Sequence, residues 1–418
     1  MVKSSISVDF YKFISSISLA LDLAESCSFK EKSDWAVFEE TLPGYSSYKH
    51  NFASHSKKTA LISMYIGRKM NYDTIRLNNL FISSFLHDVG AVDAFSACHS
   101  DKSFIYEHSE FGSEIVKKLP VDSKISDFIR YHHDNHDGSG PNRISGSSIP
   151  EEAQIIHIAD LFELMYHDNI PYRHQRDKLL NWVRSKKNIL FSPDASDALL
   201  EAAASERFWL DIENVNVEPD ILDRMHPKLS AAVDLCSLTD IARVFATIID
   251  RKSSFTHEHS IGLTDHASNF ARYYGFDMEK TEKLRISALL HDLGKLSIPN
   301  SILDKPGKLT SEEYSIIKSH TYYTKLILGK IDGMEDITEW ASNHHETLRG
   351  TGYPEGLNAE RLSLESRIMT VCDIYQALTE RRPYRNGIDK LKALAIIDSL
   401  VRRGDIDAQI VKGLKDIV

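Results

Sequence analysis

Apolar residues recur at three- and four-residue intervals along most of the chain, as they do on the buried face of an α-helix. This spacing is clearest in residues 10–24, 59–70, 77–86, 111–119, 238–249, 266–274, 284–290, 312–327 and 391–401. Alternating patterns typical of β-strands are scarce. Glycine and proline gather in residues 137–141, 299–307 and 349–354, where we expect loops. The pattern therefore predicts an all-α protein.

An ordered set of histidines and aspartates occurs twice in the chain. The matching segments are Ser54-His55-Ser56 with Glu258-His259-Ser260, Leu86-His87-Asp88-Val89-Gly90 with Leu290-His291-Asp292-Leu293-Gly294, His132-His133 with His344-His345, and Ile155–Asp160 with Ile368–Asp373. The intervals repeat as well: 32 residues for His55–His87 and His259–His291, and 24 residues for His108–His132 and His320–His344. After its His-Asp pair the first half is eight residues shorter. We infer a tandem duplication.

The duplication predicts two helical domains. A chain of 418 residues is too long for one ordinary core. Pro219, Pro227 and several acidic residues predict a linker between the halves, which we place at residues 216–234. The first domain then spans residues 1–215 and the second spans residues 235–418.

Composition narrows the possible partners. The chain is 42% hydrophobic and 26% charged, as in globular proteins. No apolar run reaches the roughly 18 residues that span a bilayer, and the N-terminus has no signal-peptide pattern, so we expect no membrane partner. Four cysteines without paired spacing suit the cytoplasm. A net charge of −10 argues against binding a nucleic-acid polymer, although a local basic pocket for a small anion is compatible with it.

The second half carries a set of residues typical of metal ligands: His259, His291, Asp292, His320, His344, His345 and Asp373. Any one of these histidines alone is more often an ordinary surface or core residue, but the repeated ordered set favours a site. Seven ligands exceed what one ion needs, so we predict two divalent ions, bridged by Asp292 and a water. Imidazole and carboxylate together suit iron, manganese or nickel. Adjacent residues on a helix point about 100° apart, so His344 and His345 are expected to serve different ions.

Lys295 follows Asp292 by three residues and would share its face on a helix. Asp292 and Lys295 are the predicted catalytic residues. A hydroxide that bridges the two ions would attack a phosphodiester, while Lys295 stabilises the developing charge or protonates the leaving oxygen. The alternative is that Lys295 only forms a solvated ion pair.

The second half resembles the HD-GYP subgroup of the HD-domain metal phosphohydrolases over nearly all of residues 235–418. The matching motifs are His291-Asp292-Leu293-Gly294-Lys295, Ile298-Pro299, Leu303-Asp304-Lys305-Pro306-Gly307-Lys308-Leu309, His320, His344-His345-Glu346, Gly350-Thr351-Gly352-Tyr353-Pro354, Asp373 and Arg382-Pro383-Tyr384-Arg385. The resemblance implies a helical fold, two or three metals, and hydrolysis of bacterial cyclic dinucleotides to a linear 5′-phosphorylated dinucleotide. Because tandem chains of this kind resemble phosphodiesterases that act on 3′,3′-cyclic GMP-AMP, we expect that substrate first and cyclic di-GMP next.

Two positions depart from the family pattern. Phe255 stands where the family has a glutamate for a third metal, so we expect two ions. Arg349 replaces the aspartate that opens the Gly-Tyr-Pro loop, and its positive charge is a candidate for substrate binding. Arg382 and Arg385 are candidate phosphate clamps, because guanidinium binds phosphate bidentately. Tyr353 is expected either to stack on a base or bond a phosphate, or else to anchor the loop.

The first half keeps a full set of candidate ligands: His55, His87, Asp88, His108, His132, His133 and Asp160. Its groups for handling phosphate are missing, since Ala91 replaces Lys295 and Gly140-Pro141 lacks the tyrosine. We therefore expect a degenerate, non-catalytic domain that supports the second or forms a homodimer. Two alternatives to the phosphodiesterase remain open: a catalytically silent cyclic-dinucleotide sensor or scaffold, and an HD-type nucleotide phosphohydrolase.

Overall fold

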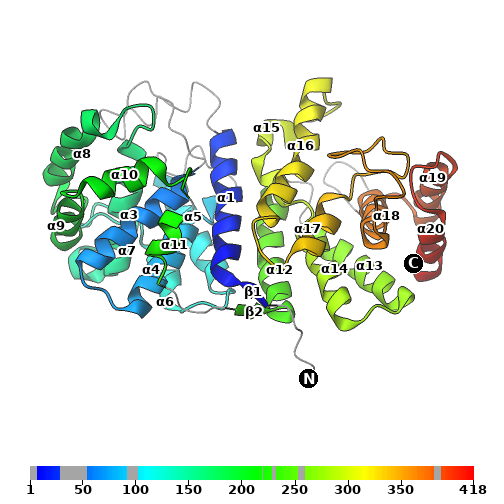
Figure 1. Cartoon of the computed structure of the whole chain (residues 1–418), viewed down its shortest axis with the longest axis horizontal. Helices are drawn as coiled ribbons and strands as arrows, with labels where there is room; N and C mark the ends of the chain where they lie inside the picture. The colour runs from blue at the N-terminus through cyan, green and yellow to red at the C-terminus, as the bar shows by residue number, and fades with distance from the viewer. Residues whose placement is uncertain are drawn as a thin grey trace. The chain divides into compact units, whose positions relative to one another are not determined.

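The computed structural model describes residues 7–28, 54–91, 102–218, 220–227, 232–252, 259–380 and 387–418. The chain forms two compact units, whose elements are labelled in Figure 1. One unit, here the C-terminal unit, contains Met1–Ser16 and Ala231–Val418, and the other, the N-terminal unit, contains Ile17–Ser230. The described residues are almost entirely helical, which confirms the predicted all-α class. Among them, no helix combines the length and apolar character that crossing a bilayer requires.

The C-terminal unit holds the second copy of the duplicated set. Its elements are β1 (Ser7–Asp9), the start of α1 (Phe10–Ser28), β2 (Ala232–Asp234), α12 (Leu235–Lys252), α13 (His259–Tyr274), α14 (Met278–Leu290), the 3₁₀ helix η5 (Leu293–Ser297), α15 (Asn300–Leu303), α16 (Ser311–Leu328), α17 (Glu335–Ser342), α18 (Leu364–Thr379), α19 (Lys390–Arg402) and α20 (Ala408–Ile417). The short helix α15 lies inside residues 299–307, so the prediction of a plain loop there is wrong. Pro299 occupies its N-cap position and supplies a fixed φ for its start.

The N-terminal unit repeats the main helices of the C-terminal unit. Its elements are the rest of α1, α3 (His55–Lys69), α4 (Thr74–Leu86), α5 (Lys102–Val116), α6 (Lys124–Arg130), the 3₁₀ helix η4 (Gly146–Ser148), α7 (Glu151–Met165), α8 (Tyr172–Lys186), α9 (Pro193–Ala202), α10 (Glu206–Asn214) and α11 (Asp220–Met225). Local signals repeat too: Asp73 caps α4 and Asp277 caps α14, each by accepting a backbone N–H three residues on.

The duplication extends further upstream than the histidines suggested. Strand β1 leads into α1 and strand β2 leads into α12, and the two strands pair antiparallel with Val8 opposite Val233. This pairing places residues 7–9 with the C-terminal unit, whereas the sequence alone predicts that they belong to the first domain. The segment 216–234, expected as a linker, contains α11 and β2.

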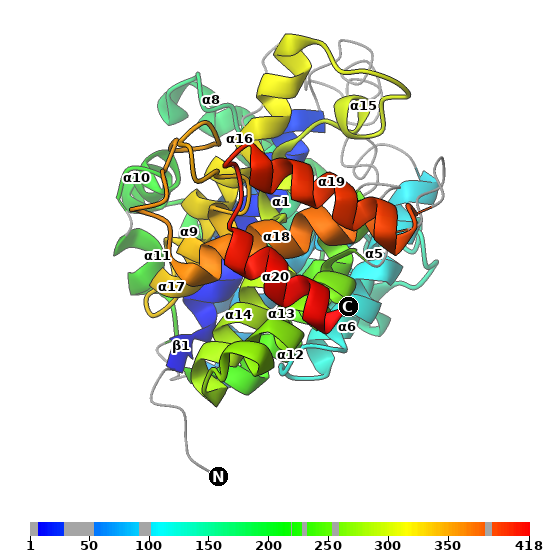
Figure 2. The same ribbon diagram turned by 90° about the vertical axis from the view of Figure 1, so that its right-hand side faces the viewer.

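One apolar cluster fixes the helices that carry the candidate ligands of the C-terminal unit. Buried side chains of α13, α14, α18, α19 and α20 pack together, among them Leu263, Phe270, Met369 and Ile410. Figure 2 shows α19 and α20 lying over α13 and α18. Each such side chain contributes roughly 1.5–3 kcal/mol by leaving water. The cluster therefore fixes the position of α13 against α18, and these helices supply His259 and Asp373.

Candidate metal centre

The seven predicted ligands of the second half converge within the C-terminal unit. His259 begins α13, His291 and Asp292 follow α14, His320 lies within α16, His344 and His345 follow α17, and Asp373 lies within α18. Two groups of ligand atoms that share no residue lie close enough to hold an ion: His259, His291 and Asp373 form one, and His320, His344 and His345 form the other. A third group, His291, Asp292 and His344, overlaps both.

Asp292 lies between the two groups. Its Oδ2 atom is 3.1 Å from His291 Nε2, while its Oδ1 atom is 3.5 Å from His320 Nε2 and 4.0 Å from His344 Nε2. One carboxylate thus faces one group with each oxygen. This position would allow the carboxylate to contact a cation in each group.

Backbone carbonyls orient the buried imidazoles. His291 Nδ1 donates to Ala288 O at 2.9 Å, and His344 Nδ1 donates to Ala341 O at 2.6 Å. His320 Nδ1 donates in the same way to the carbonyl of Ile317. Because a carbonyl only accepts, Nδ1 of each of these rings carries a proton, and Nε2 faces the centre of the cluster. Partners of this kind fix the ring orientation of metal-binding histidines.

Burial and neighbouring charges shift the pKa values of the clustered side chains. Burial lowers the pKa of His320 to about 3 and that of His344 well below its usual value, so both rings are neutral at pH 7. Burial alone would raise the pKa of Asp292, but His291 and Lys295 outweigh it and hold that pKa well below its usual value. The pKa of His259 rises to about 9, because its hydrogen bonds to Asp373 and Glu380 outweigh its burial.

The donor set fits divalent cations. Neither His291 Nε2 nor Asp292 Oδ1 makes a hydrogen bond within the part of the chain that the structure describes, although both atoms are buried. Buried polar atoms without hydrogen bonds are costly unless a cation compensates them. Imidazole nitrogen together with carboxylate oxygen suits transition metals. The buried His/Asp cluster is therefore of the metal-binding type.

The local structure around two motifs differs from expectation. His344 and His345 lie in the turn after α17, so the prediction that they are neighbours on a helix is wrong. The turn places both rings in the group of His320: the ring centroids of His344 and His345 are 4.2 Å apart, and His344 Nε2 is 3.3 Å from His320 Nε2. His345 Nδ1 also lies 3.9 Å from Asp373 Oδ2 of the other group. Lys295 lies on η5, and its Nζ is 2.6 Å from Asp292 Oδ2.

The glycine after the His-Asp pair lets α16 approach. A Cβ atom at Gly294 would lie 1.9 Å from the carbonyl oxygen of His320, a distance that no side chain tolerates. Thr324 joins the same two segments, because its Oγ1 accepts from Gly294 N and donates to His291 O. Thr324 is a positioning residue that sequence reasoning missed, since hydroxyl bonds to backbone leave no periodic signal.

The Gly-Tyr-Pro loop is held by a buried glutamate. Glu346 accepts backbone N–H groups from residues 355, 356 and 357 at 2.7–3.0 Å. A Cβ atom at Gly352 would lie 2.5 Å from His345 O, so glycine is needed for the close approach. The loop thereby brings the Tyr353 ring to 4.9 Å from the His345 ring. Burial, chiefly, raises the pKa of Tyr353 and keeps its hydroxyl protonated.

A second carboxylate orients His259. Its Nδ1 lies 3.1 Å from Glu380 Oε2, which leaves Nε2 to face Asp373 Oδ1 at 3.2 Å. Glu380 follows α18 directly and is another residue that sequence reasoning missed, because its distance from His259 in the chain carries no pattern. Such partners maintain both the tautomer and the basicity of a ligand.

Replacing Glu380 with glutamine is expected to lower the Mn²⁺ affinity of the site by about 10- to 100-fold, because His259 loses its charged partner. Titration of chelated protein with Mn²⁺ measures this effect. Glu360→Gln is the control, since Glu360 is an exposed glutamate of the same unit. Equal affinities for the two variants would show that Glu380 does not orient a ligand.

The predicted substrate-binding residues are not all among the described residues. Tyr353 lies beside His345, as described above. The Arg349 side chain is half-exposed, and its Nη1 is 3.5 Å from Asp405 Oδ1. Arg382, Arg385 and the position of Phe255 lie outside the described residues.

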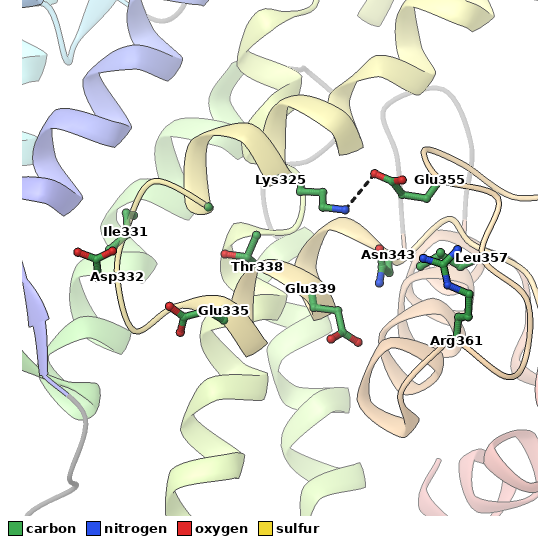
Figure 3. Close-up of a pocket in the computed structure, with 11 residues that line it drawn as sticks. Lys325, Ile331, Asp332, Glu335, Thr338, Glu339, Asn343, Glu355, Leu357 and Arg361 are labelled. Atoms are coloured by element: carbon green, nitrogen blue, oxygen red, sulfur yellow. Dashed lines mark hydrogen bonds and ion pairs between the residues drawn. The ribbon is translucent and has the colours of Figure 1, made fainter. Parts of the chain in front are cut away.

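A surface pocket of about 390 Å³ lies near the end of α16, beside α17 and the loop at residues 355–361 (Figure 3). Lys325 and Glu355 form an ion pair of 2.9 Å on its wall. The lining includes Asn343, the neighbour of His344, but none of the seven predicted ligands. This pocket is therefore separate from the candidate metal centre.

Comparison with known proteins identifies the family. A family model described as "HD domain" matches residues 45–180 and 243–410. The chain belongs to the HD domain family. Each matched HD segment contains one complete set of the duplicated histidines and aspartates, and this confirms two tandem HD-type domains.

HD-domain relatives of this chain include enzymes that act on cyclic dinucleotides. The chain is 26% identical to the 3′3′-cGAMP-specific phosphodiesterase 1 of Vibrio cholerae over 85% of each chain. It is 30% identical to the 3′3′-cGAMP-specific phosphodiesterase 3 of the same organism, over 69% of this chain and 62% of that relative. The crystal structure of V-cGAP3, a cyclic GMP-AMP-specific phosphodiesterase of V. cholerae, matches with a TM-score of 0.65 at 23% identity, covering 99% of this chain and 98% of that one, and so shares the fold.

Proposed function

We propose that this chain is a metal-dependent phosphodiesterase that hydrolyses a bacterial cyclic dinucleotide to a linear 5′-phosphorylated dinucleotide. The observation that carries the proposal is the position of Asp292, one oxygen of which faces each group of buried histidines. The relatives that act on 3′3′-cGAMP support that substrate first, and relatives named cyclic di-GMP phosphodiesterases support cyclic di-GMP next. The proposed ligands are the seven residues of the C-terminal unit described above.

Two divalent ions of the iron, manganese or nickel type, when bound, supply a water of lowered pKa and a Lewis acid for a phosphate oxygen. The chain's own residues do the rest. Asp292 and Asp373 are ionised, so they supply the negative charge that balances the cations. Hydrolysis forms a bond from water oxygen to phosphorus, breaks the bond to a ribose 3′-oxygen, and needs one proton on that oxygen. Lys295, adjacent to Asp292, holds a proton for this purpose and a positive charge for the transition state.

The centre is open on one side. The side chain of His345 is 31% exposed and that of Lys295 is 23% exposed, whereas His291 is fully buried. Metal sites that catalyse a reaction keep such an open position for substrate. A phosphodiester would therefore enter beside His345, where Tyr353 presents a ring on which a base can stack.

The other substrate contacts are proposed from residue chemistry. Arg382 and Arg385 would bind the phosphate that does not react. Arg349 would contact a base or phosphate at the rim, which requires its guanidinium to move away from Asp405. We further propose that the N-terminal domain is non-catalytic and is the surface through which a homodimer would form.

Turnover of three substrates tests the proposal. Protein reconstituted with Mn²⁺ or Fe²⁺ is incubated with equal concentrations of 3′,3′-cyclic GMP-AMP, cyclic di-GMP and cyclic di-AMP, and the products are separated by chromatography. We expect linear 5′-phosphorylated dinucleotides, formed fastest from cyclic GMP-AMP. The absence of product from all three would favour a silent sensor or scaffold.

A further inference from the structure

The pocket beside α17 has no part in the proposed function. Its walls come from the end of α16 and the residues that follow it, from α17, and from the loop at residues 355–361 (Figure 3). Its volume of about 390 Å³ is within the range of small-molecule sites. Ile331 and Leu357 supply apolar surface to the wall. The pocket therefore has the size and the lining for a small organic molecule.

Helix α17 turns its polar face toward the pocket. Glu335, Thr338 and Glu339 all line it, and their spacing of three and four residues places them on one side of the helix. Ile337 and Trp340, which lie between and after them in the chain, are buried. The helix thus presents two carboxylates, one turn apart, to the same cavity.

These two carboxylates have no cationic partner. Glu335 accepts the backbone N–H of Gly333 at 3.1 Å, and Glu339 accepts the hydroxyl of Ser363 at 2.7 Å. Neither glutamate forms an ion pair within the part of the chain that the structure describes. Like charges one turn apart on a helix repel each other. A positively charged ligand would remove this repulsion.

The other two carboxylates of the lining are already paired. Asp332 pairs with Lys12 at 2.5 Å, and Glu355 pairs with Lys325 at 2.9 Å. Arg361 then supplies one positive charge against the two negative charges on α17. The lining is therefore net negative, and electrostatic complementarity favours a cationic ligand over an anionic one.

Two buried oxygen atoms of the wall also lack hydrogen-bond partners. Among the described residues, no donor reaches Thr338 Oγ1 or Asn343 Oδ1. These two residues are 7% and 2% exposed, so bulk water does not solvate them freely. Buried polar atoms normally have a partner, and an amide oxygen can only accept a hydrogen bond. The missing partner of Asn343 is therefore a donor, such as the N–H of an ammonium group.

The spacing of the carboxylates does not suit a single metal ion. Within the described ranges, the His and Asp side chains whose ligand atoms converge are the seven proposed ligands and their seven counterparts in the N-terminal unit. No carboxylate described in the pocket belongs to such a group. A hard cation such as Ca²⁺ needs roughly six to eight oxygen ligands around one point. A longer molecule with separated positive charges fits this lining better.

We propose that the pocket binds a short aliphatic diamine or polyamine. Its ammonium groups bind Glu335 and Glu339 and donate a hydrogen bond to Asn343 Oδ1, while its methylene groups pack on Ile331 and Leu357. The site shares no residue with the candidate metal centre, although Asn343 directly precedes His344 in the chain.

Binding of putrescine to the wild-type chain, without dinucleotide, tests the charge requirement. Calorimetric titration compares putrescine with n-butylamine, a monoamine of the same chain length. We expect putrescine to bind at least about fivefold more tightly, because only the diamine compensates both carboxylates. Equal affinities, or no saturable binding of putrescine, would overturn the proposal. This comparison needs no variant and no turnover, so it is independent of the proposed function.

A matched pair of double variants tests the location. Glu335→Gln/Glu339→Gln is expected to weaken putrescine binding at least about tenfold, because both charged contacts are lost. Glu312→Gln/Glu360→Gln removes the same charge from exposed positions outside the pocket, and it should bind as the wild type does. Equal losses in the two variants would show only general attraction to an acidic protein and would contradict the proposal. So would Ca²⁺ binding that replaces putrescine binding and disappears in the first variant.

Discussion

Asp292→Asn is expected to lower kcat on the preferred cyclic dinucleotide by about a thousandfold or more. The asparagine keeps the shape of the side chain but removes the charge that faces both groups of histidines. Losing a bridging ligand removes several kcal/mol of transition-state stabilisation, and about 4 kcal/mol corresponds to a thousandfold. Steady-state kinetics at saturating Mn²⁺ measures the effect.

The matched control is Asp88→Asn in the N-terminal unit. Asp88 contacts histidines of its own cluster as Asp292 does. It lacks a neighbouring lysine, because Ala91 occupies the position that corresponds to Lys295. We expect this variant to lose stability while it retains most of its turnover at temperatures where it is folded. Equal losses of turnover in the two variants would contradict the division of labour between the two units.

Lys295→Met is expected to lower kcat by about 10²–10³-fold, because the proposed proton donor and the positive charge proposed to stabilise the transition state are both lost. The same change should strengthen Mn²⁺ binding. Lys295 Nζ lies 2.6 Å from Asp292 Oδ2, so the ammonium would compete with a cation for that oxygen. Opposite changes in turnover and metal affinity are the signature of this arrangement.

Lys325→Met controls for the loss of a lysine. Lys325 forms an exposed ion pair with Glu355 in the same unit, and such surface pairs contribute at most about 1 kcal/mol. Its kcat and its metal affinity should remain those of the wild type. If Lys295→Met behaved like Lys325→Met, Lys295 would have only the role of an ion pair.

The sequence points to the proposed ligand set because that set is repeated. The His-Asp pairs recur at identical intervals in two halves, and a repeated order is visible without any structure. The partners of those ligands could not be found in this way. The sequence assigns no role to Thr324, Glu346 or Glu380, because each acts through a contact that only the folded chain creates.

Three of the helices that periodicity missed have physical reasons for it. Helix α7 is buried on nearly all of its faces, so its apolar residues show no stripe. Helices α6 and α17 have 7 and 8 residues, shorter than the window in which a period is readable. Strands β1 and β2 have three residues each and depend on each other for their hydrogen bonds. Their pairing could not be predicted from either segment alone.

Turnover of 3′,3′-cyclic GMP-AMP by chelated and by reconstituted wild-type protein tests the central claim most directly. Elemental analysis first establishes that the chelated protein contains no transition metal. The account predicts no detectable linear dinucleotide from that protein and full recovery when Mn²⁺ or Fe²⁺ is added back. Hydrolysis at an undiminished rate by the metal-free protein would contradict it.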